Sequence, residues 1–522
     1  MITTNRWRWL LFITIIIYFS FAFLLGFSRY WGYMSSINDL GHYDHAVWGL
    51  QFQPFFSTPG IGQGCNFLGV HFNPVLLLFV PLYAIFSNVI WLTIAQALAL
   101  SMAAWPIFLL ANRICKSEKI GFLWACVYLM NPFLLNAAAW DFHPVMLAVP
   151  FVALDMLAIE TKRPYLLFGS TLFILLCKEH FGVMAVGFGL LWYIRNRTWK
   201  PAFCLVLIGI MHSFMVLGII MPALSPSGNH PMLAGRYSWL GHSMGEILKR
   251  LFTDPFSIIK TAMIDLKGAP YLVLLFAFFC GFPFLAPEFL LPGLADLTAN
   301  ILSDISMPKT LFGYHGATLM PVFIIAAIYG AKRISTWQAR YSLGELAVLV
   351  VVVSFIGGYI FAPLPLPGAY NFWAPAHFLN GPDSRVHTIR SMVGDDASAS
   401  VQANVGSHFS QRHKIYRYPN MIDEVDAVIL RLESPTKNIN NLPESLTKTR
   451  KYFLKMLDSH LQMDRTDYIR SIRSMLYDKE YGVLLWDDPW LVLSRKVLNR
   501  DFEQKIKQKL DTLQKEWKID LE

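Results

Sequence analysis

Several short motifs in this 522-residue chain combine side chains that could carry out a transfer reaction. They are SINDLGHYDHAVWGL with Asp39, His42, Asp44 and His45, HFNP from His71, WDFHP with His143, KEH at 178–180, and GYHG with His315. A carboxylate can take the proton of an acceptor hydroxyl, while a lysine or histidine neutralises a phosphate leaving group. Five residues turn a helix by about 500 degrees, so Asp39 and Asp44 need not act as a pair.

Each of these residues also has a purely structural explanation. Asp39 could cap the helix that follows it, and Asp44 could be a hydrated loop carboxylate. Lys178 and Glu179 could neutralise one another at an interface, and His315 could be an interfacial histidine. Carboxylates and phosphate oxygens could also hold a divalent cation, but no spacing identifies a metal site.

The composition indicates that most of these motifs lie in a membrane protein. Hydrophobic residues make up 55% of the chain and charged residues 15%, against about 25% charged in soluble domains. Residues 1–362 hold 21 Lys+Arg and 14 Asp+Glu, in short loops between apolar runs, and 363–522 hold 23 and 21. That pattern is typical of membrane orientation and argues against nucleic acid. Neither a cysteine framework nor a GxGxxG or GxxxxGK[ST] nucleotide loop occurs.

The apolar runs predict a mainly α, polytopic bundle of about eleven spans. We expect them at roughly 9–28, 88–111, 120–137, 144–160, 164–178, 181–194, 201–221, 269–286, 289–304, 315–331 and 343–362. Lys and Arg collect in alternate loops, so the N-terminus should be cytoplasmic and the tail extracytoplasmic. Residues 71–86 are apolar but carry Pro74 and Pro81, and they are expected as an interfacial or re-entrant helix.

The tail is expected to be a separate domain, giving domains 1–362 and 363–522. It starts with a proline-rich linker at 362–370. Strand-like runs at 426–432, 481–486 and 490–496 alternate with helix-like stretches, which predicts a small α/β or α+β domain. A final helix, 502–517, has one apolar face and should pack on this domain or lie at the membrane surface.

The predicted outer loop 222–268 carries more cations than the sidedness rule expects. It contains Arg236, Lys249, Arg250, Lys260 and Lys267. The loop is either a solvated face or a surface that attracts lipid phosphate or an anionic substrate. Arg236 is the candidate, because its surroundings are rich in glycine and aromatic residues.

The ordered set of motifs resembles a bacterial membrane-protein family known as domain of unknown function 2079. The resemblance rests on NDLGHYDHAVWGL, LGVHFNPVLLLFVPLYAIF, FHP, KEH, YHGATLMPVFIIAAIYGAKR and SVQANVGSHFSQRHKIYRYP. Asp39, Lys178 and Glu179 match the family's motifs, whereas the family more often has glutamine near Asp44 and aspartate at His180. Its layout is similar to the GT-C glycosyltransferases, which implies a polyprenyl-phosphate-linked sugar donor and a first-loop acid as base.

The resulting hypothesis is a GT-C-like glycosyltransferase at the outer face of a bacterial plasma membrane. Its partners would be membrane lipid and a polyprenyl-phosphate sugar donor, with no nucleic acid; the oligomeric state stays open, as does a divalent cation. The catalytic candidates are Asp39 and Glu179. The substrate-binding candidates are Asp44, His71, His143, Lys178, Arg236 and His315.

Two other classes of protein fit the same residues. In a transporter or flippase for lipid-linked or anionic solutes, the charged side chains would line a pathway, although no matching halves are seen in the sequence. In a non-catalytic envelope scaffold, deletion of 363–522 would abolish function while point changes in the first loop would not.

Overall fold

The computed structural model describes residues 6–52, 57–58, 65–225, 235–364, 366–367, 380–434, 447–478, 480–497 and 499–520. The protein is mainly helical and forms two compact units. The first unit comprises Met1–Gly26, Asn66–Phe79 and Ile90–Leu379; the second comprises Phe27–Cys65, Val80–Val89 and Asn380–Glu522. Four residues of the expected linker 362–370, namely 365 and 368–370, lie outside the described residues, and the domain division at residue 362 stays a prediction.

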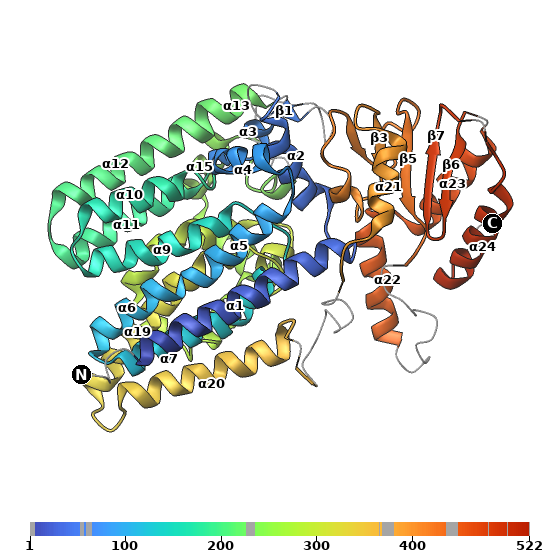
Figure 1. Cartoon of the computed structure of the whole chain (residues 1–522). Helices are drawn as coiled ribbons and strands as arrows, with labels where there is room; N and C mark the ends of the chain where they lie inside the picture. The colour runs from blue at the N-terminus through green and yellow to red at the C-terminus, as the bar shows by residue number, and fades with distance from the viewer. Residues whose placement is uncertain are drawn as a thin grey trace. The chain divides into compact units, whose positions relative to one another are not determined.

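Helices make up the first unit. Its elements are α1 (Arg6–Trp31, whose last residues belong to the second unit), α3 (Phe67–Val70), η2 (Pro74–Phe79), α5 (Ile90–Met102), α6 (Ala104–Cys115), α7 (Glu118–Met130), α8 (Pro132–Ala138), α9 (Val145–Glu160), α10 (Pro164–Leu175), α11 (Phe181–Asn196), α12 (Trp199–Met215), η3 (Val216–Ile220), α13 (Met221–Leu224), α15 (Met244–Thr253), α16 (Pro255–Lys260), η4 (Thr261–Asp265), α17 (Gly268–Ala277), η5 (Phe282–Leu285), η6 (Pro287–Gly293), α18 (Leu294–Leu302), η7 (Met307–Lys309), α19 (Leu319–Trp337) and α20 (Leu343–Phe361). Figure 1 shows α9 to α12 running alongside one another.

The expected count of eleven spans is not confirmed. Among the described residues, five helices are long and apolar enough to cross a membrane: Arg6–Trp31, Ile90–Cys115, Trp199–Leu224, Leu319–Trp337 and Leu343–Phe361. A sixth span results if Glu118–Met130 and Pro132–Ala138, bent by 55°, count as one. The other apolar runs fold into helices such as α10, with 12 residues, that fall short of the roughly 20 residues a span requires.

Helices α11 and α12 pack closely because glycines face each other. A Cβ at Gly182 on α11 would lie 2.5 Å from the carbonyl oxygen of Gly209 on α12, and a Cβ at Gly209 would meet Gly182 in the same way. Small residues let two backbones approach in this manner. The packing fixes the start of α11, which directly follows the KEH motif.

A five-stranded mixed sheet organises the second unit (Figure 1). The strand order is β4-β3-β5-β7-β6, with β3 parallel to β4 and β5, and β7 antiparallel to β5 and β6. Its elements are η1 (Ile37–Gly41), α2 (His42–Gly49), β1 (Ser57–Thr58), α4 (Val80–Ile85), α21 (Ser384–Val393), β3 (Ala399–Val401), η9 (Gly406–His408), β4 (Ile415–Arg417), β5 (Ala427–Arg431), α22 (Thr447–Leu461), α23 (Arg465–Tyr477), β6 (Gly482–Asp487), β7 (Trp490–Ser494) and α24 (Glu503–Trp517); β2 (Cys65–Asn66) lies at its boundary.

Both faces of this sheet are covered. Along β5, Val428 and Leu430 join a core with α22, α23 and α24. Ile429 points the other way and packs with α21, Tyr33 and Ile37. The three expected strands and the last helix are confirmed, and α24 packs in the core of the unit through its apolar face.

Candidate functional site

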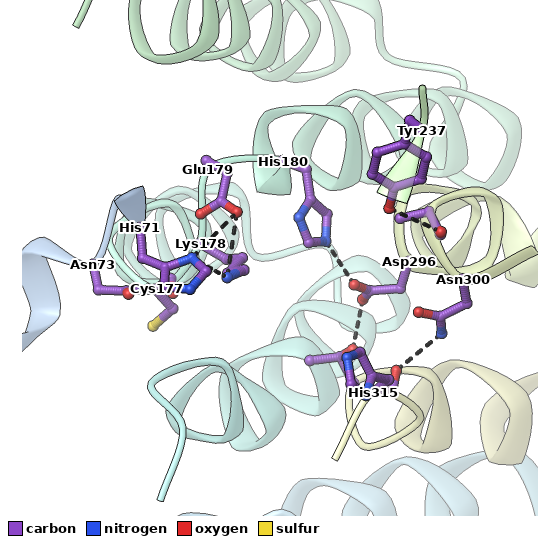
Figure 2. A network of polar contacts seen from close by, with 12 residues as sticks. His71, Asn73, Cys177, Lys178, Glu179, His180, Tyr237, Asp296, Asn300 and His315 are labelled. Carbon is purple, nitrogen blue, oxygen red and sulfur yellow. Dashed lines mark hydrogen bonds and ion pairs between the residues drawn. The ribbon is translucent and has the colours of Figure 1, made fainter. Parts of the chain in front are cut away.

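The KEH motif contacts the HFNP motif within the first unit. His71 follows α3, and Lys178 to His180 connect α10 to α11. The amide of Asn73 donates to the carbonyl of Cys177 at 2.6 Å, and this bond holds the two segments together. Lys178 Nζ then lies 3.1 Å from Nδ1 of His71 and 3.3 Å from Oε1 of Glu179 (Figure 2). The predicted convergence of these residues is therefore seen in the structure.

Glu179 is the buried member of this cluster. Its side chain is 7% exposed, whereas those of Lys178 and His71 are 15% and 18% exposed. Besides the lysine, the carboxylate accepts a hydrogen bond from the backbone N–H of Phe72 at 3.4 Å. A buried carboxylate with two such donors fixes the ammonium group while leaving part of it accessible.

A second polar pair lies beside this cluster. His180 Nε2 is 2.7 Å from Oδ1 of Asp296 on α18, and the hydroxyl of Thr318 donates to Oδ2 of the same carboxylate at 2.5 Å. Asn300, one turn further along α18, donates to the backbone carbonyl of His315 at 3.1 Å. Helix α18 thus holds KEH and GYHG in the same region (Figure 2).

The FHP and GYHG motifs meet through stacked rings. The imidazole of His143 stacks on Tyr314 with ring centroids 3.5 Å apart, and Tyr314 stacks on His315 at 4.1 Å. His143 is oriented by Nδ1, which lies 2.9 Å from the carbonyl oxygen of Asp141. Both ring nitrogens of His315 are buried without a hydrogen-bond partner among the described residues.

Arg236 lies beside the end of α18. Burial lowers the pKa of His315 well below its usual range, and the charges of Arg236, His143, Lys178 and His180 lower it further. The backbone carbonyl of Arg236 accepts a hydrogen bond from Asp304 at 3.0 Å, just after α18. The first unit therefore gathers five of the predicted binding residues in one region: His71 and Lys178 contact Glu179, His143 and His315 stack on Tyr314, and Arg236 acts on His315.

Asp39 and Asp44 belong to the second unit. Ser36 caps η1 by accepting from the N–H of Asn38, so the expectation that Asp39 caps the helix is wrong; Asp39 lies half-buried in the first turn. Gln462 holds this motif, because its Nε2 donates to Ser36 Oγ at 3.1 Å and its Oε1 accepts from Asn38 at 2.6 Å.

Asp44 is buried rather than hydrated, which corrects the second structural explanation. Oδ1 accepts from the hydroxyl of Tyr83 at 2.7 Å and from Gln411 at 3.0 Å, and Oδ2 accepts from Ser410 at 2.5 Å. Burial raises the pKa of Asp44, against the opposing effect of these three donors. His45 adds a contact from Nδ1 to the carbonyl of Ser410 at 2.8 Å. This geometry favours a structural role for Asp44.

Comparison with known proteins gives the family of the chain. The family described as predicted membrane protein (DUF2079) matches residues 29–461. The chain belongs to this family. No curated protein matches this DUF2079 member.

Solved structures similar to this DUF2079 member include two of ArnT from Cupriavidus metallidurans. The first, bound to undecaprenyl phosphate, has a TM-score of 0.50 and 11% sequence identity. The matched region covers 95% of the DUF2079 member and 100% of the ArnT chain. The second, in the apo state, has a TM-score of 0.49 and 10% sequence identity. The matched region covers 94% of the DUF2079 member and 98% of the ArnT chain. At this identity the likeness concerns the fold alone. The expected similarity to a GT-C glycosyltransferase fold is confirmed.

The sequence did not predict several hydrogen-bond partners of the KEH motif and of Asp44 in this DUF2079 member. Asp296 and Thr318 complete the KEH region, and Tyr83, Ser410 and Gln411 enclose Asp44. Ser410 and Gln411 lie inside the SHFSQ stretch of the quoted tail motif, which is the one sequence signal for them. Across the described part of the chain, no three His, Cys, Asp or Glu side chains are arranged to hold a metal ion.

Proposed function

We propose that this membrane protein is a GT-C-like glycosyltransferase. It transfers a sugar from a polyprenyl-phosphate-linked donor to an acceptor at the outer face of a bacterial plasma membrane, with the N-terminus cytoplasmic and residues 363–522 extracytoplasmic. One observation carries the proposal: Lys178 is held by His71 and Glu179, and both it and Arg236 act electrostatically on His315, in a fold similar to that of ArnT bound to undecaprenyl phosphate.

The cluster suits a phosphate group that gains charge as it leaves. Lys178 keeps a partly exposed ammonium fixed in place, so little reorganisation is needed when the bond to the phosphate oxygen breaks. Arg236 supplies a second cation, and His71 a further nitrogen, for the remaining phosphate oxygens. His143 and His315 line the same region through Tyr314.

Glu179 is assigned a positioning role within this function. Its buried carboxylate bonds Lys178 and the backbone of Phe72, so it orients the lysine instead of reaching the sugar. The role of Asp39 as base rests on its match to the sequence motif, and an Asp39→Asn protein that is folded, inserted and fully active would remove it.

Release of polyprenyl phosphate tests the proposal. Purified full-length protein in lipid nanodiscs is incubated with labelled undecaprenyl-phosphate-linked sugars, and free undecaprenyl phosphate is measured. Lys178→Gln should weaken undecaprenyl phosphate binding roughly 10- to 100-fold, as expected for a charge-assisted contact. The exposed Lys119→Gln is the matched control. Transport of the intact lipid-linked sugar without release would contradict the proposal and favour a flippase.

A further inference from the structure

In the first unit, the carboxylate of Asp296 holds the imidazole of His180. The ring nitrogen Nε2 lies 2.7 Å from Oδ1 of Asp296, and the two side chains are 27% and 8% exposed. The imidazole is therefore partly accessible, while the carboxylate that holds it is nearly buried. Neither residue is among the predicted site residues.

Asp296 is held from two sides. Thr318 donates to its second oxygen at 2.5 Å. Asn300, four residues further along α18, donates to the hydroxyl of Tyr271 and to the carbonyl of His315, both at 3.1 Å. These contacts fix α18, and with it the direction from which the carboxylate meets His180.

This pairing determines which nitrogen of His180 is basic. Nε2 carries the proton because it faces a carboxylate, so Nδ1 has a free lone pair in the neutral ring. In Figure 2 that second nitrogen lies on the side of Lys178 and Glu179. An imidazole oriented by a carboxylate, with its other nitrogen directed at a reacting group, is the arrangement of a general base.

We propose that His180, oriented by Asp296, is the general base that takes the proton of the acceptor hydroxyl, in place of Asp39. The inference rests on the proposed transferase function. In this step the acceptor oxygen bonds to the anomeric carbon, the bond from that carbon to the phosphate oxygen breaks, and its electron pair stays on the polyprenyl phosphate beside Lys178. The hydroxyl proton passes to Nδ1 of His180, Asp296 stabilises the imidazolium, and the proton then leaves to solvent.

Charged groups of both signs surround His180. Asp296 faces it from α18, and Lys178 and Glu179 come from its own loop. His212 on α12 and His315 ahead of α19 also interact with it electrostatically. Asp296 is the negative group in direct contact with the imidazole of His180.

The test compares His180→Gln and Asp296→Asn with the exposed His242→Gln as control, all as full-length protein in nanodiscs. His180→Gln should lower kcat by roughly 100- to 10,000-fold, the usual contribution of a general base, while undecaprenyl phosphate binds within about 3-fold of wild type. Asp296→Asn should move the acidic limb of the kcat/KM profile to lower pH, a change that lost packing alone would not cause.

The outcomes separate the two proposals. If wild type releases no undecaprenyl phosphate from any donor, the transferase function itself is wrong. If wild type is active and His180→Gln keeps its kcat, or loses activity through weaker undecaprenyl phosphate binding, only the base is wrong. If His180→Gln does not fold, an unchanged pH profile in Asp296→Asn overturns the inference.

Discussion

The hydroxyl of Ser410 donates a hydrogen bond to Oδ2 of Asp44 at 2.5 Å, although the two residues are 366 positions apart. Tyr83 and Gln411 complete the set of donors around the same carboxylate. One buried acid thus joins three separate segments of the second unit.

Loss of the Asp44 carboxylate should destabilise the second unit. Asp44→Ala leaves the donors of Tyr83, Ser410 and Gln411 without their acceptor, at a cost of roughly 3 kcal/mol. Chemical unfolding in detergent checks this, with the exposed Asp423→Ala as control. Equal stability of the two variants would show that the network contributes nothing.

The stability of the protein should fall in acid because of His408. Burial lowers the pKa of His408 to about 3, although its ring contacts the carbonyl of Tyr30 at 2.9 Å. The unfolded chain takes up a proton near pH 6.5 and the folded one only near pH 3, so this stability is present above pH 6.5 and is lost as pH falls. One such group costs about 2 kcal/mol between pH 6.5 and 4.5.

The variant His408→Phe keeps a ring against Tyr30, with which His408 is stacked at 3.9 Å. Its unfolding free energy should depend less on pH than that of wild type or of the exposed control His387→Phe. Identical pH slopes in all three proteins would rule out His408 as the source.

A methyl group at Gly182 should separate α11 from α12. Gly182→Ala places a Cβ against the backbone of Gly209 and should cost about 1 to 3 kcal/mol. Gly169→Ala is the matched control, because nothing lies within 4 Å of a Cβ there, and alanine favours the helix by up to about 1 kcal/mol. Melting temperatures should therefore move in opposite directions; a shift of the same sign would contradict the packing argument.

The local stability of the INDLG motif, residues 37–41, should depend on the hydrogen bonds of Gln462. Gln462→Ala removes the bonds to Ser36 and Asn38 and frees Arg417, which also contacts the amide oxygen at 2.7 Å. We expect faster hydrogen exchange at 37–41, with little change in overall melting temperature. Arg470→Ala, an exposed residue of α23, is the control, and exchange that stays at the wild-type rate would argue against this support.

The proposed orientation can be read from cysteine labelling in intact cells. An impermeant maleimide should modify Asp467→Cys, at an exposed site of the second unit, without permeabilisation. Lys119→Cys, at an exposed position near the start of α7, should react only after the membrane is permeabilised. The reverse pattern would place the tail in the cytoplasm and remove the proposed outer-face reaction.

The sequence predicted those parts of the fold that depend on local patterns. The runs that became β5, β6 and β7 are apolar or alternate in polarity, and the apolar stripe of α24 is visible from residue spacing alone. The short strands β3 and β4, with three residues each, carry too little pattern to be recognised. The count of about eleven spans is not confirmed, because hydropathy alone does not show how short a helix each apolar run forms.

For the site, the sequence predicted which residues of the first unit lie close together better than how they are bonded. The contact between His71 and Lys178 follows the expected convergence of the motifs. The sequence offers Asp44 either as a substrate-binding residue or as a hydrated loop carboxylate, because its partners, 39 and 367 positions away, leave no local trace. The contact between Asp296 and His180 leaves no sequence signal, since only the tertiary fold brings two residues 116 positions apart together.

The interleaved composition of the second unit also has a consequence for biosynthesis. Segments ending at residue 89 must wait until residue 380 and beyond have been translated before their shared core can close. At roughly 5 to 20 residues per second, this delay is on the order of 15 to 60 s. A nascent chain that stalls in this interval contains Asp44 but not yet its partner Ser410. Recognition of incompletely folded chains by cellular quality control should therefore matter most during this interval.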